Sequence, residues 1–484
     1  MVDPPQRVLP AEFGRRLVTE WQGRGEAVRQ ALECGSPVVS LRLNQKKLRD
    51  GIPPLPPEWL VDAIPWCEGG YFLPQRPSFT LDPLMHAGVY YVQEASSQIL
   101  DAVLSQLGPI RLGLDLCAAP GGKSQIIGKH LQAGGHLMCN EVSRTRVASL
   151  EETLAKWGNP RMSVWNAEPR DFVNAAFRFD CILVDAPCSG EGLFRRETQA
   201  VERWKPELAE TCMRTQRKIL DEIMPCLGDN GILIYSTCTL SRLENEDQWH
   251  YLVKCGLVPV PLPFPQAWGW ADSADLYSDM PAGHAFRMLP DQGLGEPFFL
   301  VCFRKPGHAN TSPVGGEPER TGVEWESNPR LPLAVGLPAD TRLLVNKNQC
   351  YVVSDWVFHH FDAKRWKKCL KPGTRFSGGN GPGASVPPHE LALLAECGWN
   401  ETPSIELDER EALWYLSGKE FDPGGMPKGF FLVRHRGFPL GWGYPKGRSL
   451  SRSYPAPWRI RMVNRQSPNR SGPESADAPG APGG

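Results

Sequence analysis

The sequence predicts an α/β protein in which a mostly parallel, doubly wound sheet is followed by a small β-rich domain. Short apolar runs of strand length alternate with helical patterns between residues 111 and 303. Such alternation is typical of a sheet with helices on both faces. Beyond it lies a segment rich in proline, glycine and polar residues (306–330), followed by short strand-like runs only. This change of composition predicts a linker between two units.

The elements before the central sheet predict a small α+β segment. Residues 11–35 have the spacing of a helix, with apolar positions at Phe13, Leu17 and Trp21. Residues 40–44 are expected to form a strand, and the prolines between residues 53 and 57 interrupt the chain. Residues 90–100 lead into a helix that is expected to end near residue 107.

The central part alternates between strands and helices. Strands are expected at residues 111–117, 136–141, 162–166, 179–186, 231–238 and 298–303. Helices are expected at residues 121–131, 143–158 and 208–228, the last of them stopped by Gly228. The runs before Cys188 and Cys238 are short and mainly apolar, which is typical of buried strands.

Five segments follow from these patterns. We expect an N-terminal α+β segment (1–90), a central α/β domain (91–305), a linker (306–330), a C-terminal β-rich region (331–465) and a low-complexity, disordered tail (466–484). Within the C-terminal region, strands are expected near 341–346 and 350–354, and a helix near 389–398.

Composition narrows the class of protein. Of the 484 residues, 41% are apolar and 22% charged, an ordinary globular balance, and the net charge of -1 excludes a uniformly basic protein. No signal region begins the chain, and no apolar run approaches the roughly 18 residues of a membrane span. The 14 cysteines include no CxxC pair, which argues against a disulfide scaffold and against a zinc site. We therefore expect free thiols in a cytoplasmic protein, with no metal, no membrane contact and no evident protein partner.

A glycine turn follows the first central strand, in LDLCAAPGGKS (114–124). Glycines there let a ligand approach the backbone, and the N-terminus of the next helix favours negative charge. A P-loop fails on spacing, because its first glycine would fall on Cys117, and the dinucleotide motif GxGxxG is absent. A purely structural turn is one alternative. The remaining interpretation is a site for S-adenosylmethionine (SAM), with Asp115 and Lys123 near its amino-acid part.

Two further carboxylates extend this interpretation. Glu141 ends the next strand, where an acidic residue suits the ribose hydroxyls of an adenosine. Glu168 follows the third strand and is a candidate acceptor for the adenine amino group. A surface charge in a loop is the alternative for Glu168, with Asp171 as its competitor for the adenine contact.

Cys188 and Cys238 each follow an apolar strand, where an α/β sheet opens its binding crevice. Amino-group methyltransferases favour an aromatic residue in the first of these loops, but this chain has Asp-Ala-Pro-Cys at 185–188. A thiol indicates attack on an otherwise unreactive carbon, such as C5 of a pyrimidine, after a thiolate has added at C6. Burial in the core is the alternative. It is expected for the cysteines inside strands, namely Cys139, Cys181 and Cys302.

Three segments carry a family resemblance: DLCAAPGGKS, DAPCSGEG and YSTCTLSRLENE resemble the signature segments of the Nop/Sun (Fmu) family of SAM-dependent RNA cytosine-C5 methyltransferases. LRLN (41–44) and YYVQEASSQIL (90–100) resemble that family's N-terminal segment. Residues 441–460 resemble the C-terminal PUA-like extension of the bacterial RsmF-type branch of the family, which acts on 16S ribosomal RNA. The resemblance covers nearly the whole chain and is strongest over 90–246. It implies a Rossmann-like SAM methyltransferase sheet and a C-terminal PUA-like domain.

The resemblance also implies roles for individual residues. Cys238 would add to C6 of cytosine, and Cys188 would assist release of the methylated base. Asp185 would hydrogen-bond the cytosine, with Lys123 in the same pocket. The implied SAM contacts are Asp115, Cys117, Ala118, Ala119, Pro120, Gly121, Gly122, Lys123, Glu141, Arg146, Glu168 and Asp185. The chain departs from the family at Glu168, where Asp is more frequent, and at LPDQGLGEPFF (289–299), where Asp291 and Pro297 stand in altered positions.

A reactive thiolate needs a lowered pKa, for which Lys123, Arg195 and Arg196 are the candidate cations. The two arginines are equally candidates for RNA phosphate. A cytosine inside a helix must be exposed or flipped before it can react, and affinity should come mainly from phosphate contacts. The expected RNA contacts are Arg42, Asn44, Lys46, Lys47, Arg195, Arg196, Lys446, Arg448 and Arg459.

Between residues 428 and 472 about ten lysines and arginines occur and no acidic residue, which is typical of a nucleic-acid face, with a solvated face as the alternative. Three hypotheses stay open at this point. The chain is a cytosine-C5 methyltransferase of 16S ribosomal RNA, or the same enzyme acting on tRNA, or an rRNA-binding ribosome-assembly factor whose methylation is incidental.

Overall fold

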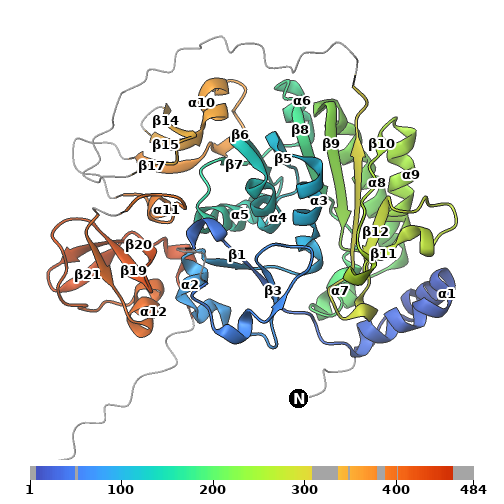
Figure 1. Ribbon diagram of the computed structural model, residues 1–484, viewed down its shortest axis with the longest axis horizontal. Coiled ribbons are helices and arrows are strands. Elements are labelled where there is room, and N and C mark those ends of the chain that lie inside the picture. The colour runs from blue at the N-terminus through green and yellow to red at the C-terminus, as the bar shows by residue number, and fades with distance from the viewer. Residues whose placement is uncertain are drawn as a thin grey trace, which may run out of the picture.

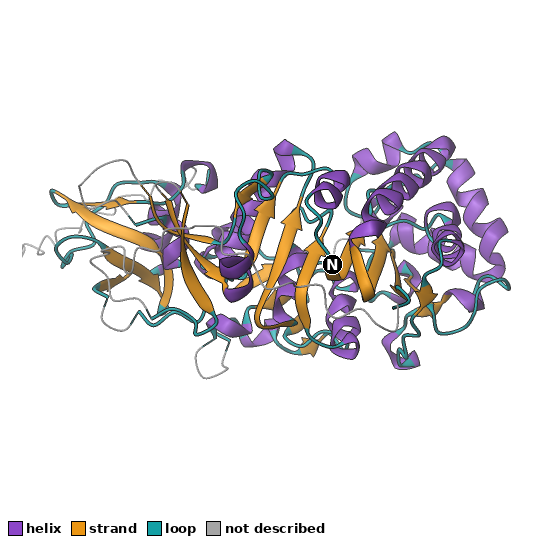
Figure 2. Cartoon of the chain, turned by 90° about the horizontal axis from the view of Figure 1, so that it is seen from above, coloured by secondary structure: helices purple, strands orange, loops and turns teal. Residues whose placement is uncertain are grey.

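The computed structural model describes residues 7–48, 53–307, 336–346, 349–378, 387–399 and 402–461. Figure 1 shows a central sheet with helices on both faces, an N-terminal sheet beside it and a C-terminal sheet at one side of the molecule. Along the long axis, strands dominate one end and helices the other (Figure 2). The expected linker, apart from residues 306 and 307, and the expected tail lie outside the described residues.

Within the described residues, ten strands form the central sheet. Its middle is parallel, in the order β7 (Met162–Trp165), β6 (Leu131–Asn140), β5 (Ile110–Asp115), β8 (Phe179–Asp185) and β9 (Leu227–Thr237). Next to β9 come the antiparallel strands β13 (Phe298–Arg304), β12 (Ala285–Met288) and β11 (Ala271–Asp272), and β10 (Val258–Pro259) pairs with β13. The α/β class is confirmed. The strand order reverses between β5 and β8, which is where such sheets open a crevice.

Both faces of this sheet are buried, which explains the apolar strand runs. Along β8, Ile182 and Val184 belong to one buried cluster, and Cys181 and Leu183 belong to the other. The first face is covered by α6 (Pro169–Asn174), α8 (Pro206–Ile223) and α9 (Glu246–Lys254). The opposite face is covered by α3 (Leu100–Leu107), α4 (Gly122–Lys129) and α5 (Arg144–Trp157). The short α7 (Thr198–Arg203) precedes α8.

The end of α8 differs from the prediction. The helix stops at Ile223 rather than at Gly228, and residues 224–226 form a single 3₁₀ turn. Pro225 has no backbone N–H to continue the helical ladder, and Leu227 already pairs with Phe179 of β8. Gly228 therefore lies in β9 and caps no helix.

The N-terminal segment divides into two parts. The helix α1 (Ala11–Cys34) packs on the central domain, where the Phe13 ring meets Phe194 edge-on and the Trp21 indole donates to the Tyr277 hydroxyl at 2.7 Å. A separate four-stranded sheet contains β2 (Asp62–Ala63), β3 (Gly70–Phe72), β1 (Ser40–Leu43) and β4 (Tyr90–Val92) in that order, with α2 (Pro83–His86) beside it. Because β1 pairs with β4, this sheet continues past the expected boundary at residue 90.

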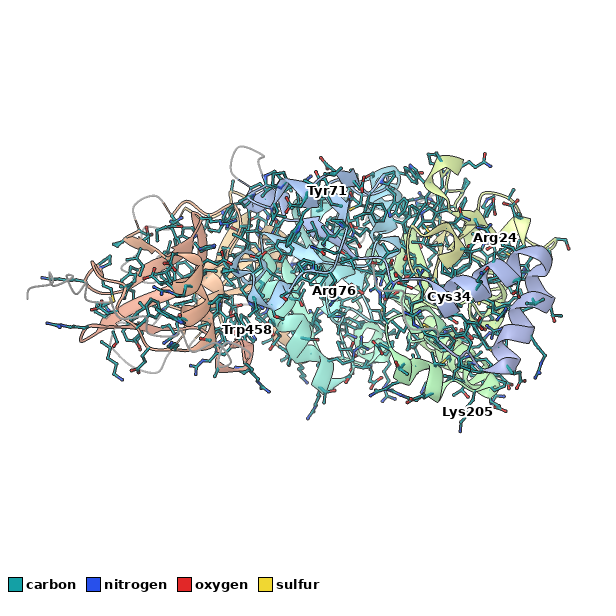
Figure 3. All side chains as sticks on the ribbon, turned by 90° about the horizontal axis from the view of Figure 1, so that it is seen from below. Arg24, Cys34, Tyr71, Arg76, Lys205 and Trp458 are labelled. Atoms are coloured by element: carbon teal, nitrogen blue, oxygen red, sulfur yellow. The ribbon has the colours of Figure 1, made fainter. Side chains whose placement is uncertain are left out.

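Seen from below, the N-terminal residues run along much of the molecule (Figure 3). Arg24 and Cys34 of α1 lie toward one end, Tyr71 and Arg76 lie near the middle, and Trp458 lies toward the C-terminal end. The N-terminal sheet shares a buried cluster with the last C-terminal sheet, in which Leu41 and Tyr90 join Tyr415 and Tyr454. The N-terminal segment therefore connects the central domain with the C-terminal sheet.

The C-terminal region is not one β-rich unit. The strands β14 (Thr341–Asn346), β15 (Gln349–Ser354) and β17 (Thr374–Gly378) form one sheet, with α10 (Asp355–His360) after β15. The strand β16 (Cys369–Lys371) instead extends the central sheet by pairing with β7. The expected helix at 389–398 is only α11 (His389–Ala392). A last sheet holds β18 (Ser404–Glu406), β19 (Phe431–His435), β20 (Phe438–Lys446) and β21 (Ser449–Arg452), with α12 (Glu409–Ser417).

Of the helices that the structure describes, none has the length and apolar character needed to span a bilayer. In the same residues, no group of three or more His, Cys, Asp and Glu side chains is arranged to hold a metal ion.

Candidate active site

A cavity of about 580 Å³ opens at the carboxyl ends of the parallel strands. The loops after β5, β6, β7, β8 and β9 line it, together with one face of α8. Its walls include Cys117, Glu141, Arg146, Glu168, Asp185, Cys188, Thr215, Lys218, Ile219, Glu222 and Cys238. A smaller cavity of about 200 Å³ shares Cys117 and Asp185 with it and reaches the glycine turn and the strand β4. The residues expected from the glycine turn and from the cysteine loops therefore meet at one place.

The glycine turn brings backbone close to these cavities. Gly121 has φ +113°, a conformation that favours glycine, and α4 begins at the next residue. A Cβ at Gly122 would lie 2.8 Å from the Tyr91 ring of β4, so a larger residue would collide with the N-terminal sheet. Ala118, Ala119, Pro120 and Gly122 all line the smaller cavity. The turn thus forms a wall made of backbone and small side chains, as a bound ligand requires.

Asp115, at the end of β5, is fully buried. Its Oδ2 accepts a hydrogen bond from the Ser124 hydroxyl at 2.6 Å, whereas its Oδ1 has no hydrogen-bond partner within the described part of the chain. Burial raises the pKa of Asp115 to about 7, although the Ser124 bond opposes this. A buried acceptor without a partner is costly, so this oxygen fits a donor on a ligand.

Glu141 is a second buried carboxylate, at the end of β6. Its Oε1 accepts from the Ser143 backbone N–H at 2.9 Å, and its Oε2 lies 3.3 Å from Arg146 Nη1. The other Arg146 terminal nitrogen, Nη2, donates to the Ala119 carbonyl at 2.6 Å, which ties the β6 loop to the glycine turn. Together Asp115 and Glu141 supply acceptors for the hydroxyl and amino groups of SAM, so the residues present fit that group.

The structure separates the two candidates after β7. Glu168 lines the large cavity. Asp171 instead accepts from the Glu168 backbone N–H at 2.9 Å, at the start of α6, and lies 3.9 Å from Lys368. Asp171 therefore stabilises the helix start, and Glu168 is the better candidate for the adenine contact.

The two motif cysteines lie against each other, with 3.3 Å between their sulfurs. Asp185 and Ser236 stand opposite each other in the β8–β9 ladder, so the loops that follow begin side by side. The hydrogen bond with Cys238 is the main cause, ahead of burial, that raises the pKa of the Cys188 thiol well above its usual range. Cys188 is therefore held as a neutral thiol.

The charged groups near Cys238 differ from those near Cys188. Burial alone would lower the pKa of Lys123, but its 2.8 Å ion pair with Asp185 and its interaction with Cys238 raise it on balance. Asp185 also accepts from the Ser236 hydroxyl at 2.8 Å. Lys123 is thus a fixed cation whose field reaches Cys238, and of the three candidate cations it is the one that this geometry favours. Arg195 is engaged by Glu296 at 2.8 Å instead.

Four expected RNA contacts are corrected by the structure. Arg42 is buried, with its guanidinium over the Trp157 ring and bonded to Gln93 and Gln125. Asn44 is buried and donates to two backbone carbonyls, those of Gly88 and Trp157. These side chains fasten the N-terminal sheet to the central domain, because their polar groups are fully used inside the protein.

Lys47 and Arg195 are corrected for the same reason. The Lys47 ammonium donates to the carbonyls of Ala87 and Lys156, and burial lowers its pKa to about 7. Arg195 is buried against Glu296, which lies in the segment that departs from the family pattern. In the same segment Asp291 pairs with Arg24 of α1 at 3.1 Å.

The other expected RNA contacts are accessible. Lys446, Arg448 and Arg459 are exposed on the last C-terminal sheet and its following turn. Lys46 is exposed and pairs with Glu396, while Arg196 is partly exposed and lies 3.3 Å from Glu296. These five residues stay candidates for RNA.

Sequence reasoning missed a set of polar residues around the cysteines. Ser189, Gln216, Thr239 and Glu244 are buried and bonded to one another beside the two thiols. Glu244 belongs to the LENE run (243–246) of the third signature segment, so its place in that segment could have marked it as a candidate site residue. The cavity wall formed by α8 could also have been found from the sequence, because its residues have the spacing of one helix face: Thr215, Lys218, Ile219 and Glu222.

Three family models match the chain. Residues 108–304 match the 16S rRNA methyltransferase RsmB/F family, residues 9–95 match the N-terminal domain of 16S rRNA methyltransferase RsmF, and residues 402–460 match the methyltransferase RsmF PUA domain.

Similar proteins agree with these matches. The ribosomal RNA small subunit methyltransferase F of Cronobacter sakazakii is 30% identical over 422 residues, covering 82% of this chain and 84% of that protein. The protein of the same name from Shewanella amazonensis is 27% identical over 453 residues, covering 87% and 92%. Among solved structures, PH0851 shares the fold, with TM-score 0.55 and 20% identity over 61% of this chain and 66% of that one. The chain belongs to the RsmF family of SAM-dependent 16S rRNA methyltransferases.

Proposed function

We propose that this protein transfers a methyl group from SAM to C5 of a cytosine in 16S ribosomal RNA through a covalent bond between Cys238 and C6. The observation that carries the proposal is the pair of Cys188 and Cys238, which both line the cavity with 3.3 Å between their sulfurs. Two thiols at the carboxyl ends of neighbouring strands suit a reaction that must both form and break a bond to a pyrimidine ring.

Each residue of the site has a proposed role in the reaction. With the Lys123 cation nearby, the Cys238 thiolate forms the S–C6 bond, and this bond makes C5 nucleophilic. Asp185 is positioned by Lys123 and Ser236 to hydrogen-bond the cytosine. SAM, when bound, supplies the methyl group. Loss of the C5 proton to solvent then breaks the S–C6 bond, and the neutral Cys188 thiol, 3.3 Å away, donates a proton to the departing Cys238 sulfur.

The proposed cofactor site consists of the glycine turn and the carboxylates that follow β5, β6 and β7. Asp115 and Glu141 would accept from donors on SAM, and Glu168 would accept from the adenine amino group. Arg146 would hold Glu141 in place. The backbone of residues 117–122 would line the ligand without side chains that obstruct it.

RNA binding is proposed to involve the exposed basic residues Lys446, Arg448 and Arg459, together with Lys46 and Arg196. Phosphate contacts of this kind should weaken binding steadily as salt rises. Because ribosomal RNA is a cytoplasmic substrate in bacteria, we also propose a cytoplasmic location.

The test compares Cys238→Ala with the native protein on small-subunit rRNA, using radiolabelled SAM. Methyl transfer is expected to vanish while SAM binding, measured by calorimetry, persists. Cys302→Ala is the matched control and should retain methyl transfer, because Cys302 is a buried cysteine of β13 that lines neither cavity of the site. Retained turnover in Cys238→Ala would refute the covalent role.

The RNA itself is identified by bisulfite sequencing of rRNA and tRNA from a deletion strain against its parent. Loss of a 5-methylcytosine in 16S rRNA is the expected result. Loss of one in tRNA alone would replace the proposed substrate with tRNA.

A further inference from the structure

The residues that immediately follow the two cysteines are bonded to each other and to one buried carboxylate. The Ser189 hydroxyl lies 2.7 Å from the Thr239 hydroxyl. Glu244 Oε2 accepts from Ser189 Oγ at 2.6 Å and from Thr239 Oγ1 at 3.4 Å, and Glu244 Oε1 accepts from the Ser189 backbone N–H at 2.9 Å. Both cysteine loops therefore share one acceptor, whose side chain has no exposed surface.

We propose that Glu244 is a positioning residue for methyl transfer, and that it fixes the separation of the Cys188 and Cys238 sulfurs by holding the next residue of each loop. This inference rests on the two-cysteine reaction proposed above. The Glu244 carboxylate touches neither sulfur in any hydrogen bond and acts through Ser189 and Thr239.

Additional bonds hold Glu244 itself and the residue before Cys188. Gln216 of α8 is fully buried and donates from Nε2 to the Pro187 carbonyl at 3.0 Å and to Glu244 Oε1 at 3.1 Å. The Tyr235 hydroxyl of β9 donates to the Glu244 backbone carbonyl at 2.7 Å. Pro187 and Ser189 are thus both restrained, so the backbone on either side of Cys188 is fixed. We define Ser189, Gln216, Thr239 and Glu244 as the Glu244 network.

The charge of Glu244 also bears on the thiols. No Lys or Arg of the described residues forms an ion pair with it, and a buried carboxylate without a counter-charge is costly. The titratable groups that interact with it are Cys188 and Glu191 in the loop after β8, Cys212 on α8 and Tyr235 on β9. When it is ionised, Glu244 adds to the causes that raise the pKa of Cys188, so Cys188 stays protonated beside a nucleophile that interacts with Lys123.

Two substitutions of Glu244 separate positioning from charge. Glutamine keeps the shape, and its oxygen can accept from Ser189 N–H and Gln216 while its amide group donates to the two hydroxyls. Alanine removes every bond of the network. Glu244→Ala should lower kcat by about 100-fold, as expected for a reacting group misplaced by about 1 Å, with KM for SAM unchanged. It should also accumulate a covalent protein–RNA adduct, because release by Cys188 is impaired, whereas Glu244→Gln should turn over without adduct.

A second pair of variants keeps the test valid if Glu244→Ala does not fold. Ser189→Ala and Thr239→Val each remove one hydroxyl, and each should slow turnover. The double variant should be little worse than the slower single one, because both act through the same network. Ser273→Ala is the matched control: it removes another buried Ser–Glu hydrogen bond, to Glu246 at 2.7 Å, outside the cysteine loops. It should leave turnover and adduct unchanged.

A measurement without RNA separates this inference from the proposed function. Phenylarsine oxide bridges two adjacent thiols, so the native protein should bind more of it than Cys188→Ala does, and Glu244→Ala should lose that excess. If the native protein transferred no methyl group but showed this pattern, the proposed function would fail while the positioning role stood. Native turnover and native arsenical binding in Glu244→Ala would overturn the positioning role.

Discussion

Replacing Glu244 with glutamine should remove a pH dependence that the stability of the native protein carries. Burial raises the pKa of Glu244 to about 7, against the bonds that Ser189 and Gln216 donate. In an unfolded chain a glutamate titrates at about 4.3. Between these two pH values the folded protein keeps a proton that the unfolded chain has lost. The native free energy of unfolding therefore falls as pH rises through this window and levels off above pH 7.

The size of this effect follows from the two pKa values. At about 1.4 kcal/mol per pKa unit, the ionised Glu244 carboxylate costs the folded state about 3 kcal/mol at pH 8 relative to pH 5. Glutamine has nearly the same shape and cannot ionise, so the variant lacks this loss. The difference in unfolding free energy between Glu244→Gln and the native protein should shift by about 3 kcal/mol in favour of glutamine from pH 5 to pH 8.

Urea unfolding followed by tryptophan fluorescence at both pH values measures this difference. Asp115, whose pKa burial also raises to about 7, is present in both proteins, so its contribution cancels. Glu58→Gln, at an exposed glutamate, controls for the substitution itself. Parallel stability curves for native and Glu244→Gln protein between pH 5 and pH 8 would refute the reasoning.

Four further outcomes are expected. Cys188→Ala should accumulate a protein–RNA adduct, visible as a shifted band on a denaturing gel; its absence would contradict the release role. Lys123→Met should slow adduct formation at least about tenfold, because it removes the cation that pairs with Asp185 at 2.8 Å and interacts with Cys238, and single-turnover rates measure this loss. SAM affinity of the native protein, measured by calorimetry, should rise as pH increases through about 7, because the ionised Asp115 carboxylate is the better acceptor. Asp115→Asn should bind SAM weakly at every pH. If SAM affinity depended on pH equally in both proteins, that would argue against an Asp115 contact. Arg287→Leu should destabilise the protein by about 3–5 kcal/mol in chemical unfolding, because it leaves Glu246 buried without its partner, and a loss under about 1 kcal/mol would show that the pair is not needed for folding.

Local patterns in the chain were enough to predict the sheet and the position of its crevice. The centres of the strands β8 and β9 are apolar because both of their faces are buried, and this burial is what made the runs before Cys188 and Cys238 recognisable. The glycine turn was recognisable for a similar reason, since Gly121 adopts a backbone conformation that other residues avoid. In both cases the physical cause acts within a few residues of the pattern.

Other features depend on contacts between distant residues. Arg42 and Lys47 have the composition of an RNA-binding patch, yet Arg42 is buried against α4 and the Lys47 ammonium donates to backbone carbonyls inside the protein, one of them on α5. The end of α8 was set by Pro225, a local signal, together with the pairing of Leu227 with Phe179 in β8, which is a distant contact. The strand β16 extends the central sheet from far along the chain, so no pattern near residue 369 could reveal its partner β7.

The sequence by itself determined the proposed chemistry, because the two cysteines, the glycine turn and the carboxylates at strand ends are identified by residue type and position. Only the tertiary structure decided how the cysteines are held. The 3.3 Å separation of their sulfurs, and the buried Glu244 that bonds Ser189 and Thr239, depend on two loops 50 residues apart meeting beside α8. Hydrogen bonds across that distance are set by packing, and packing is a property of the whole fold.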